Sequence, residues 1–206
     1  MSEIWGIVLA AGESKRMKVQ KLLLPYHGKS MIEQVIGNVI SSEVDNTLVV
    51  VGCDKDEIVG ATDHLPVSYC FNEQYKQGML SSVKSGFRSL PDEFDAALVF
   101  QGDQPGISPE VVKVIIEAYL QFNKGIVIPV FQKRRGHPVL IDHKYREEIE
   151  KLDENVGLRD LACKFPADVL EVEVNLPGIL MDIDTREEYL ISVNSNETIT
   201  GYPGVH

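Results

Sequence analysis

Long hydrophobic runs are absent from this 206-residue sequence. Its longest apolar stretches, such as TLVVVG and AALVF, have the length of a β-strand, well below the roughly 18 residues that a membrane-spanning helix needs. The first residues, MSEIW, contain no basic segment followed by a long apolar one, so we expect no signal peptide. These absences predict a cytoplasmic protein with no membrane partner.

Cysteine is scarce, and basic residues are outnumbered. Cys53, Cys70 and Cys163 are far apart and have no metal-ligand spacing, and the five histidines form no ligand pattern, so we expect no zinc site. Twenty Lys and Arg residues against 31 Asp and Glu residues give a net charge of −11. Such a surface repels a nucleic-acid backbone, although a small cluster of cations could still bind a single nucleotide.

Apolar strand-like segments alternate with helix-like segments along the chain. Continuous apolar segments such as IWGIVLA are typical of strands that are covered on both faces. The expected strands are 4–10, 47–51, 67–71, 95–100, 126–130, 137–141 and 169–174, and the expected helices are 31–42, 55–61, 81–90, 109–122, 144–152, 157–164 and 185–193. This order predicts a mostly parallel sheet with helices on both faces, in which 126–130 and 137–141 pair antiparallel. We expect one domain over 1–193 and a polar tail at 194–206.

The segment after the first expected strand, LAAGESKRM, places small residues before two positive charges. Ligands of such sheets bind beyond the carboxyl ends of the strands. Backbone N–H groups in a small-residue turn can bind an anion, and Arg16 and Lys21 can bind phosphate oxygens. The segment is neither a P-loop nor a G-x-G-x-x-G motif. The alternative is an ordinary strand-to-helix turn with solvated basic side chains.

Carboxylates follow two other strands. Asp103, in QGDQPGIS, lies beside Gly102 at the end of the fourth strand, and a carboxylate close to phosphates suits Mg²⁺. Asp182 and Asp184, in DIDTREEY, point to opposite sides if the segment is extended, so only one of them can face the site. The alternatives are a turn aspartate at 103 and a helix cap at 184, in which Thr185 and Glu188 form a capping box.

The helix expected in QGMLSSVKSGF opens with glycine and serine residues. Gly78, Ser81 and Ser82 offer N–H donors and hydroxyls suited to a base or a ribose. The alternative is a capped helix start with no ligand. All four of these segments fall at one edge of one sheet, which favours a shared site over four unrelated turns.

Several segments resemble, in order, the nucleotidyltransferases of molybdenum cofactor maturation, the MobA-like NTP transferase family. They are LAAGESKRM…KLLLP, QGMLSSVKSGF, GDQPGIS, GHPVLI, VGLRDL and DIDTREEY, and they span about residues 4–190. The resemblance implies a three-layer α/β/α Rossmann-like nucleotidyltransferase fold, with a mostly parallel sheet and one antiparallel strand. It also implies that a substrate phosphate oxygen attacks the α-phosphorus of an NTP, with Mg²⁺ or Mn²⁺ as cofactor and pyrophosphate as the leaving group.

The resemblance also implies roles for individual residues. The nucleotide-binding set would be Leu9, Ala10, Ala11, Gly12, Arg16, Lys21, Gly78, Ser81, Ser82 and Gly102. The catalytic set would be Arg16, Lys21 and Asp103. The metal would be held by Asp103 and Asp184, with Asp182 assisting. His137 in GHPV could be taken for a base, but we expect it to pack or hydrogen-bond on the acceptor side instead.

The choice of nucleotide depends on Ala11. The resemblance associates LAAG with cytidylyl transfer and LAGG with guanylyl transfer, so we expect CMP transfer from CTP to the phosphate of molybdopterin. Leu80 and Gln20 depart from the usual cytidylyl pattern, and Leu80 leaves base recognition open. The alternatives are guanylyl transfer from GTP and nucleotidyl transfer to another phosphorylated small molecule. A different class is a non-catalytic cofactor-binding chaperone for a molybdenum hydroxylase, which would tolerate loss of the cations and carboxylates.

Overall fold

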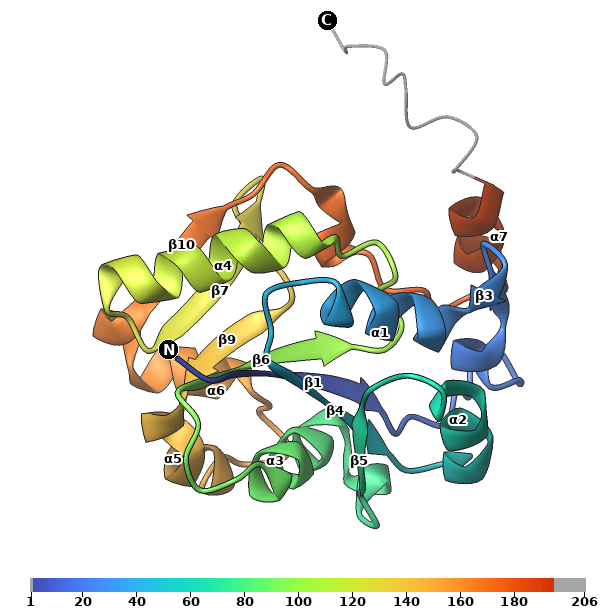
Figure 1. The fold of residues 1–206 in the computed structure, drawn as a ribbon, viewed down its shortest axis with the longest axis horizontal. Helices are drawn as coiled ribbons and strands as arrows, with labels where there is room; N and C mark the ends of the chain where they lie inside the picture. The colour runs from blue at the N-terminus through green and yellow to red at the C-terminus, as the bar shows by residue number, and fades with distance from the viewer. Residues whose placement is uncertain (1, 195–206) are drawn as a thin grey trace, which may run out of the picture.

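The computed structural model of the chain describes residues 2–194 and builds them around a single large sheet (Figure 1). Its strands follow the spatial order β10-β7-β9-β6-β1-β4-β5. They are β1 (Ile4–Ala10), β4 (Asn46–Val51), β5 (Ser68–Phe71), β6 (Ala96–Gln101), β7 (Ile126–Phe131), β9 (Val139–Asp142) and β10 (Val169–Glu173). The two-residue strand β8 (Arg134–Arg135) pairs with β7, and β2 (Pro25–Tyr26) and β3 (Lys29–Ser30) form a separate hairpin.

The sheet is mostly parallel, as expected. Strand β1 pairs in parallel with β4 and β6, β4 with β5, and β10 with β7. Strand β9 lies between β6 and β7 and is antiparallel to both. The expectation of one antiparallel strand in a mostly parallel sheet is therefore confirmed, and the short β8 adds an antiparallel segment that was not expected. The carboxyl ends of β1, β4, β5 and β6 all lie at the same edge.

Helices cover both faces of the sheet and make three layers (Figure 1). On one face lie α1 (Met31–Ile40), α2 (Lys55–Thr62) and α4 (Pro109–Phe122), and on the other lie α3 (Met79–Ser89), α5 (Arg146–Glu150) and α6 (Arg159–Lys164). The last helix, α7 (Arg186–Asn194), lies at the periphery beside β3 (Figure 1). Short 3₁₀ segments are η1 (Lys21–Leu23), η2 (Tyr75–Gln77), η3 (His143–Tyr145), η4 (Pro166–Asp168) and η5 (Pro177–Leu180).

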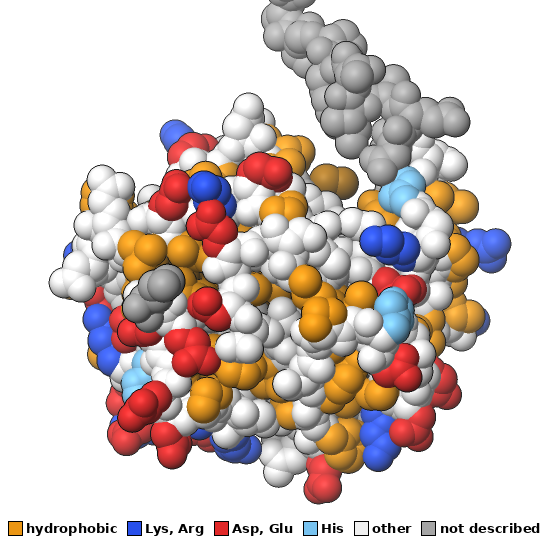
Figure 2. All heavy atoms as spheres, viewed as in Figure 1, with side chains coloured by type: hydrophobic (Ala, Val, Ile, Leu, Met, Phe, Trp, Pro, Cys, Tyr) orange, Lys and Arg blue, Asp and Glu red, His pale blue; other side chains and the backbone are white. Residues whose placement is uncertain are grey.

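Strand β1 shows why the central strands are apolar throughout. Ile7 and Val8 point to opposite faces of the sheet, and both side chains have no exposed area because helices cover both faces. Helix α1 begins at a capping box, in which the Ser30 side chain accepts from the backbone N–H of Glu33 and the Glu33 side chain accepts from that of Ser30. On the face of the molecule in Figure 2, acidic side chains are interspersed with basic and apolar ones.

Most element boundaries lie within two residues of those expected. The segment expected as a helix at 144–152 divides into η3 and the shorter α5, because the Asp142 side chain accepts from the Lys144 backbone N–H and starts a 3₁₀ turn. The expected tail at 194–206 lies outside the described residues except for Asn194, which closes α7, so the domain division stays a prediction. Within residues 2–194, no helix combines the length and the apolar character that spanning a membrane requires.

Candidate active site

A cavity of about 360 Å³ opens at the edge of the sheet where β1 and β6 end. Most of the residues expected at the site line this cavity. Those that do are Leu9, Ala11, Gly12, Arg16, Lys21, Gly78, Ser82, Asp103 and Asp184. The site is thus assembled from the segments that follow four different strands.

The turn after β1 forms one wall of the cavity and is held from both sides. The carbonyl oxygen of Ala11 accepts from Cys53 N at 3.2 Å, and that of Leu9 accepts from Gly102 N at 3.0 Å. A Cβ atom on Gly52 would lie 2.8 Å from the Ala11 oxygen, and one on Gly102 would lie 2.8 Å from the Leu9 oxygen. Glycine is therefore required at both positions, since the ends of β4 and β6 approach the turn backbone closely.

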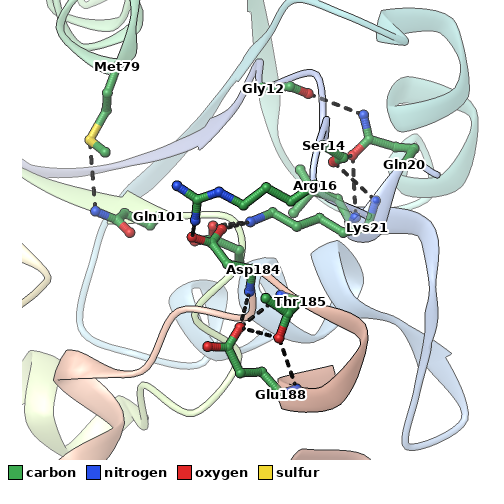
Figure 3. Close-up of polar contacts among 12 residues, drawn as sticks. Gly12, Ser14, Arg16, Gln20, Lys21, Met79, Gln101, Asp184, Thr185 and Glu188 are labelled. Atoms are coloured by element: carbon green, nitrogen blue, oxygen red, sulfur yellow. Dashed lines mark hydrogen bonds and ion pairs between the residues drawn. The ribbon is translucent and has the colours of Figure 1, made fainter. Parts of the chain in front are cut away.

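Gln20 organises the loop that carries the cations (Figure 3). Its side-chain amide donates to the carbonyl oxygen of Gly12 at 3.3 Å and to Asp54 Oδ2 at 2.9 Å. Its Oε1 accepts from Ser14 Oγ at 2.9 Å, and Ser14 Oγ in turn accepts from Lys21 N at 3.1 Å. Gln20 therefore ties both ends of the loop together. In the sequence it stood out only as a departure from a family pattern.

Lys21 lies between two carboxylates. Its Nζ is 2.6 Å from Asp103 Oδ2 and 2.7 Å from Asp184 Oδ1, although these residues are 82 and 163 positions away in the sequence. Arg16 also pairs with Asp184 (Figure 3). The Lys21 side chain is only 13% exposed, whereas that of Arg16 is 73% exposed. The ammonium group is therefore enclosed with the carboxylates, and the guanidinium group reaches in from the rim.

The electrostatics distinguish the two carboxylates. Burial raises the pKa of Asp103, and this effect exceeds the opposing attraction of Lys21. The hydrogen bond from Lys21 holds the pKa of Asp184 below its usual range. Burial acts to lower the pKa of Lys21, but Asp103 and Asp184 outweigh it and raise that pKa. Asp103 is therefore the carboxylate that gains most from a further cation.

The donor set fits a metal ion that is shared with a ligand. Asp103 Oδ1 is buried and has no hydrogen-bond partner within the described part of the chain. Among residues 2–194, no group of three His, Cys, Asp or Glu side chains could hold a metal on its own. Mg²⁺ is commonly held by one or two carboxylates together with phosphate oxygens. Asp103 and Asp184 match that pattern, whereas Asp182 is exposed and does not line the cavity.

The start of α3 forms the opposite wall. Gly78 has a φ of 111°, a conformation that favours glycine. Ser81 Oγ donates to the carbonyl oxygen of Gly78 at 2.8 Å and accepts from Asn72 Nδ2 at 2.9 Å, so it braces the helix start behind the cavity. Ser82 lines the cavity, and its Oγ accepts from Asn72 Nδ2 at 3.0 Å. Its own proton remains available to a ligand.

Five expected site residues do not line the cavity. Ala10 is buried in the core, and Gly102 packs its backbone against β1. Ser81, Asp182 and His137 are not among the lining residues. His137 is nevertheless within 3.3 Å of the Gln101 amide, and Gln101 does line the cavity.

Seven lining residues were not in the expected set. Four of them, Glu13, Ser14, Lys15 and Leu22, belong to the segment after β1, and the other three come from other segments. These three are Tyr75, Met79 and Gln101. Gln101 ends β6, and the chain turns directly after it, with Gln104 N donating to the Gln101 carbonyl oxygen at 3.3 Å, so the two-residue period of the strand does not extend to Asp103. Tyr75 and Met79 flank Gly78 on a 3₁₀ turn and a helix start, where no period identifies the side that faces a ligand.

His137 gives a prediction about stability. Burial lowers the pKa of His137 from 6.5 to about 4. Between these values the unfolded chain binds a proton that the folded chain does not, so the unfolding free energy falls as the pH falls from 6.5 to 4. Phenylalanine does not titrate, so in His137→Phe the fall in unfolding free energy between pH 6.5 and pH 4 should be smaller than in wild type by up to about 3 kcal/mol. Urea unfolding at pH 7 and pH 4.5 measures it, and equal pH dependence in both proteins would contradict it.

The sheet is mostly parallel, and cations, carboxylates and a small-residue turn line one cavity at its edge. This combination defines the class of the nucleotidyltransferases. A family model described as "MobA-like NTP transferase domain" matches residues 6–167, and the chain belongs to that family.

Curated relatives and solved structures agree with this assignment. A probable molybdenum cofactor guanylyltransferase from Natranaerobius thermophilus is 29% identical over 173 residues, which cover 82% of each chain. A molybdenum cofactor cytidylyltransferase from Escherichia coli is 25% identical over 191 residues, 92% of this chain and 95% of the relative.

Among solved structures, a nucleotidyl transferase from Methanothermobacter thermautotroptrophicus superposes with a TM-score of 0.80 at 25% identity, over 93% of this chain and 96% of the other. Rv0371C from Mycobacterium tuberculosis, solved in complex with manganese, superposes with a TM-score of 0.76 at 20% identity, over 94% of this chain and 100% of the other.

Proposed function

We propose that this chain transfers CMP from CTP to the terminal phosphate of molybdopterin and releases pyrophosphate. The observation that carries the proposal is the single cavity that joins Ala11 and Gly12 to Lys21, Asp103 and Asp184. The first two offer a close backbone approach to a nucleoside. The other three offer the charges that a triphosphate and a divalent ion require.

The roles of the charged residues follow from their present partners. Lys21 and Arg16, which now pair with carboxylates, would turn to the phosphate oxygens and neutralise the charge that develops there. Asp103 and Asp184 would hold Mg²⁺ or Mn²⁺. When bound, the ion supplies charge neutralisation on the α-phosphate.

No protein nucleophile is required, because the acceptor phosphate supplies the attacking oxygen. The lowered pKa of His137, about 4, makes its imidazole a weak base. His137 is therefore assigned to the acceptor side and not to proton transfer. The product would pass to a molybdenum hydroxylase. Because nucleoside triphosphates are held in the cytoplasm, the activity belongs there.

The preference for CTP rests on Ala11. Its side chain is only 4% exposed, and it lines the cavity beside the base segment at Gly78 and Ser82. The cytidylyltransferase from Escherichia coli supports this preference, while the relative from Natranaerobius thermophilus keeps GTP as the second candidate.

Turnover with each of the four NTPs tests the function directly. The reaction contains Mg²⁺ and molybdenum-loaded molybdopterin, and pyrophosphate release is followed. We expect release with CTP that depends on the acceptor. If pyrophosphate release is fastest with GTP, the nucleotide in the proposal is GTP and not CTP. Release only with a sugar phosphate in place of molybdopterin would overturn the acceptor, and no release at all would favour the chaperone.

Substitutions at Ala11 test the nucleotide preference. Ala11→Gly should lower the ratio of kcat/KM for CTP to that for GTP by about tenfold, because one methyl group in a pocket is worth about 1–3 kcal/mol. Ala11→Val should impair CTP use, because its added methyl groups extend into the cavity wall.

Melting temperatures provide the control for this series. The Ala11 Cβ lies close to Gly52, so a lower Tm in Ala11→Val would show a folding cost that must be separated from nucleotide binding. An unchanged ratio in Ala11→Gly together with normal CTP use in Ala11→Val would contradict the role of Ala11.

A further inference from the structure

Gln101 lines the cavity at the end of β6. It is the last residue of β6 and lies in register with Leu9 of β1, which also lines the cavity. The segment with Gly78 and Ser82, which we call the base segment, follows β5. In the sheet, β1 and β4 lie between β6 and β5. His137 lies just before β9, the neighbour of β6 on the other side. Gln101 therefore lies between the base segment, whose Met79 it contacts, and the side of the cavity next to His137.

The amide nitrogen of Gln101 is held at two points. It lies 3.8 Å from Met79 Sδ (Figure 3) and 3.4 and 3.3 Å from Nδ1 and Nε2 of His137. The ring atom Cε1 lies between these two nitrogens. If the Gln101 amide nitrogen lay in the plane of the ring, nearly the same distance from both ring nitrogens, it would overlap Cε1. The amide nitrogen therefore lies over the face of the imidazole, where an N–H group is attracted by the π-electrons.

The imidazole is itself fixed in place. The backbone N–H of His137 donates to the carbonyl oxygen of Ile179 at 3.0 Å. Burial lowers the pKa of the ring, so at neutral pH it carries no charge that would repel the amide N–H. The carboxamide of Gln101 thus has a preferred orientation, with its nitrogen toward Met79 and His137.

The amide oxygen has no such partner. Gln101 Oε1 forms no hydrogen bond within residues 2–194, although Gln101 lines the cavity. A carboxamide whose nitrogen is anchored presents its oxygen as a fixed, uncharged acceptor. Such a group is suited to an N–H donor on a neutral heterocycle and has no donor to offer a phosphate.

We propose that Gln101 binds the acceptor substrate by accepting a hydrogen bond from an N–H group of its heterocycle, and that His137 and Met79 act through Gln101 as positioning residues. This inference rests on the proposed function, since it assigns the ring of the same acceptor. Gln101 is two residues from Asp103, and both side chains line the same cavity. That arrangement allows one molecule to place a phosphate at the metal site and a ring at Gln101.

Gln101→Leu tests the contact, because leucine keeps much of the volume and removes the acceptor oxygen. Binding of a methylene-bridged CTP analogue is measured by calorimetry. Binding of molybdopterin is then measured by pterin fluorescence with the analogue saturating. We expect about a tenfold rise in the Kd for molybdopterin and less than a twofold change in the Kd for the analogue.

Two substitutions at His137 test the positioning role. His137→Phe keeps an aromatic face beneath the amide, whereas His137→Ala removes it. We expect His137→Phe to bind molybdopterin within about twofold of wild type and His137→Ala to bind about fivefold more weakly. A purely structural role would impair analogue and molybdopterin binding together.

Each other result overturns a defined part of the inference. If His137→Phe binds as weakly as His137→Ala, the ring nitrogens act directly and the positioning role is wrong. If Gln101→Leu weakens analogue binding and leaves molybdopterin binding unchanged, Gln101 contacts the nucleotide. If wild type binds molybdopterin and Gln101→Leu binds it equally well, only the Gln101 contact is wrong. If wild type does not bind molybdopterin, the proposed function and this inference are both wrong.

Discussion

Lys21→Met is expected to lower both the turnover rate and the stability of the folded chain. The rate should fall on the order of 10²-fold or more, because one charge-assisted contact in the transition state is worth about 2–4 kcal/mol. The unfolding free energy should fall by about 3 kcal/mol, because the enclosed Asp103 and Asp184 would lose the cation between them. Steady-state kinetics and urea unfolding measure the two effects.

Arg16→Met is the matched control for Lys21→Met. The Arg16 side chain is 73% exposed, and exposed ion pairs contribute little to stability. Its rate should fall while its unfolding curve stays close to that of wild type. Early unfolding in both variants with normal turnover in the folded fraction would mean that these cations serve the fold alone.

Asp103→Asn is expected to abolish productive metal binding while leaving the fold intact. Loss of the ion should cost several kcal/mol of transition-state stabilisation, or roughly a 10³-fold fall in rate. Folding should tolerate the change, because burial already disfavours the charged form of Asp103. Electron paramagnetic resonance of Mn²⁺, titrated in the presence of a methylene-bridged CTP analogue, measures the binding directly.

Asp182→Asn is the control for Asp103→Asn, because it removes a carboxylate that is near in the sequence to Asp184 but is not assigned as a metal ligand. Asp182 is exposed and does not line the cavity, so its amide variant should bind Mn²⁺ within about twofold of wild type. Stronger loss of Mn²⁺ in Asp182→Asn than in Asp103→Asn would exchange the roles of these two residues.

The fold could be predicted where the pattern is local and repeated. The continuous apolar strand β1 and the helical spacing of α1 depend on burial that the sequence itself displays. The insertion of β9 between β6 and β7 could not be predicted, since strand order depends on packing between segments far apart. The hairpin of β2 and β3 and the two-residue β8 are too short for any period to appear.

The charged residues of the candidate site could be identified from the sequence. Their burial and their hydrogen-bond partners could not. Asp103 follows directly after an apolar strand, so its place at the sheet edge could be expected. Nothing near Lys21 in the sequence indicates that its side chain is enclosed, whereas that of Arg16 is exposed. Lys21 begins the 3₁₀ segment η1, and two distant carboxylates enclose it. Gln20 and Gln101 act through partners distant in the sequence, so neither could be identified from its neighbours.

Helix α7 serves the site and contributes little to the core. None of its residues is fully buried. Directly before it, Asp184 N donates to Glu188 Oε2 at 2.9 Å, and Thr185 and Glu188 complete a capping box. Ser192 Oγ lies 3.0 Å from Tyr26 Oη of the β2–β3 hairpin.

The second carboxylate of the site therefore lies between the buried Ile183 and a peripheral helix that contributes no fully buried residue. A change that frees Asp184 without disturbing the buried Ile183 is expected to leave the melting temperature near that of wild type and to abolish turnover. Thermal stability alone would be a poor guide to whether a preparation of this protein is competent.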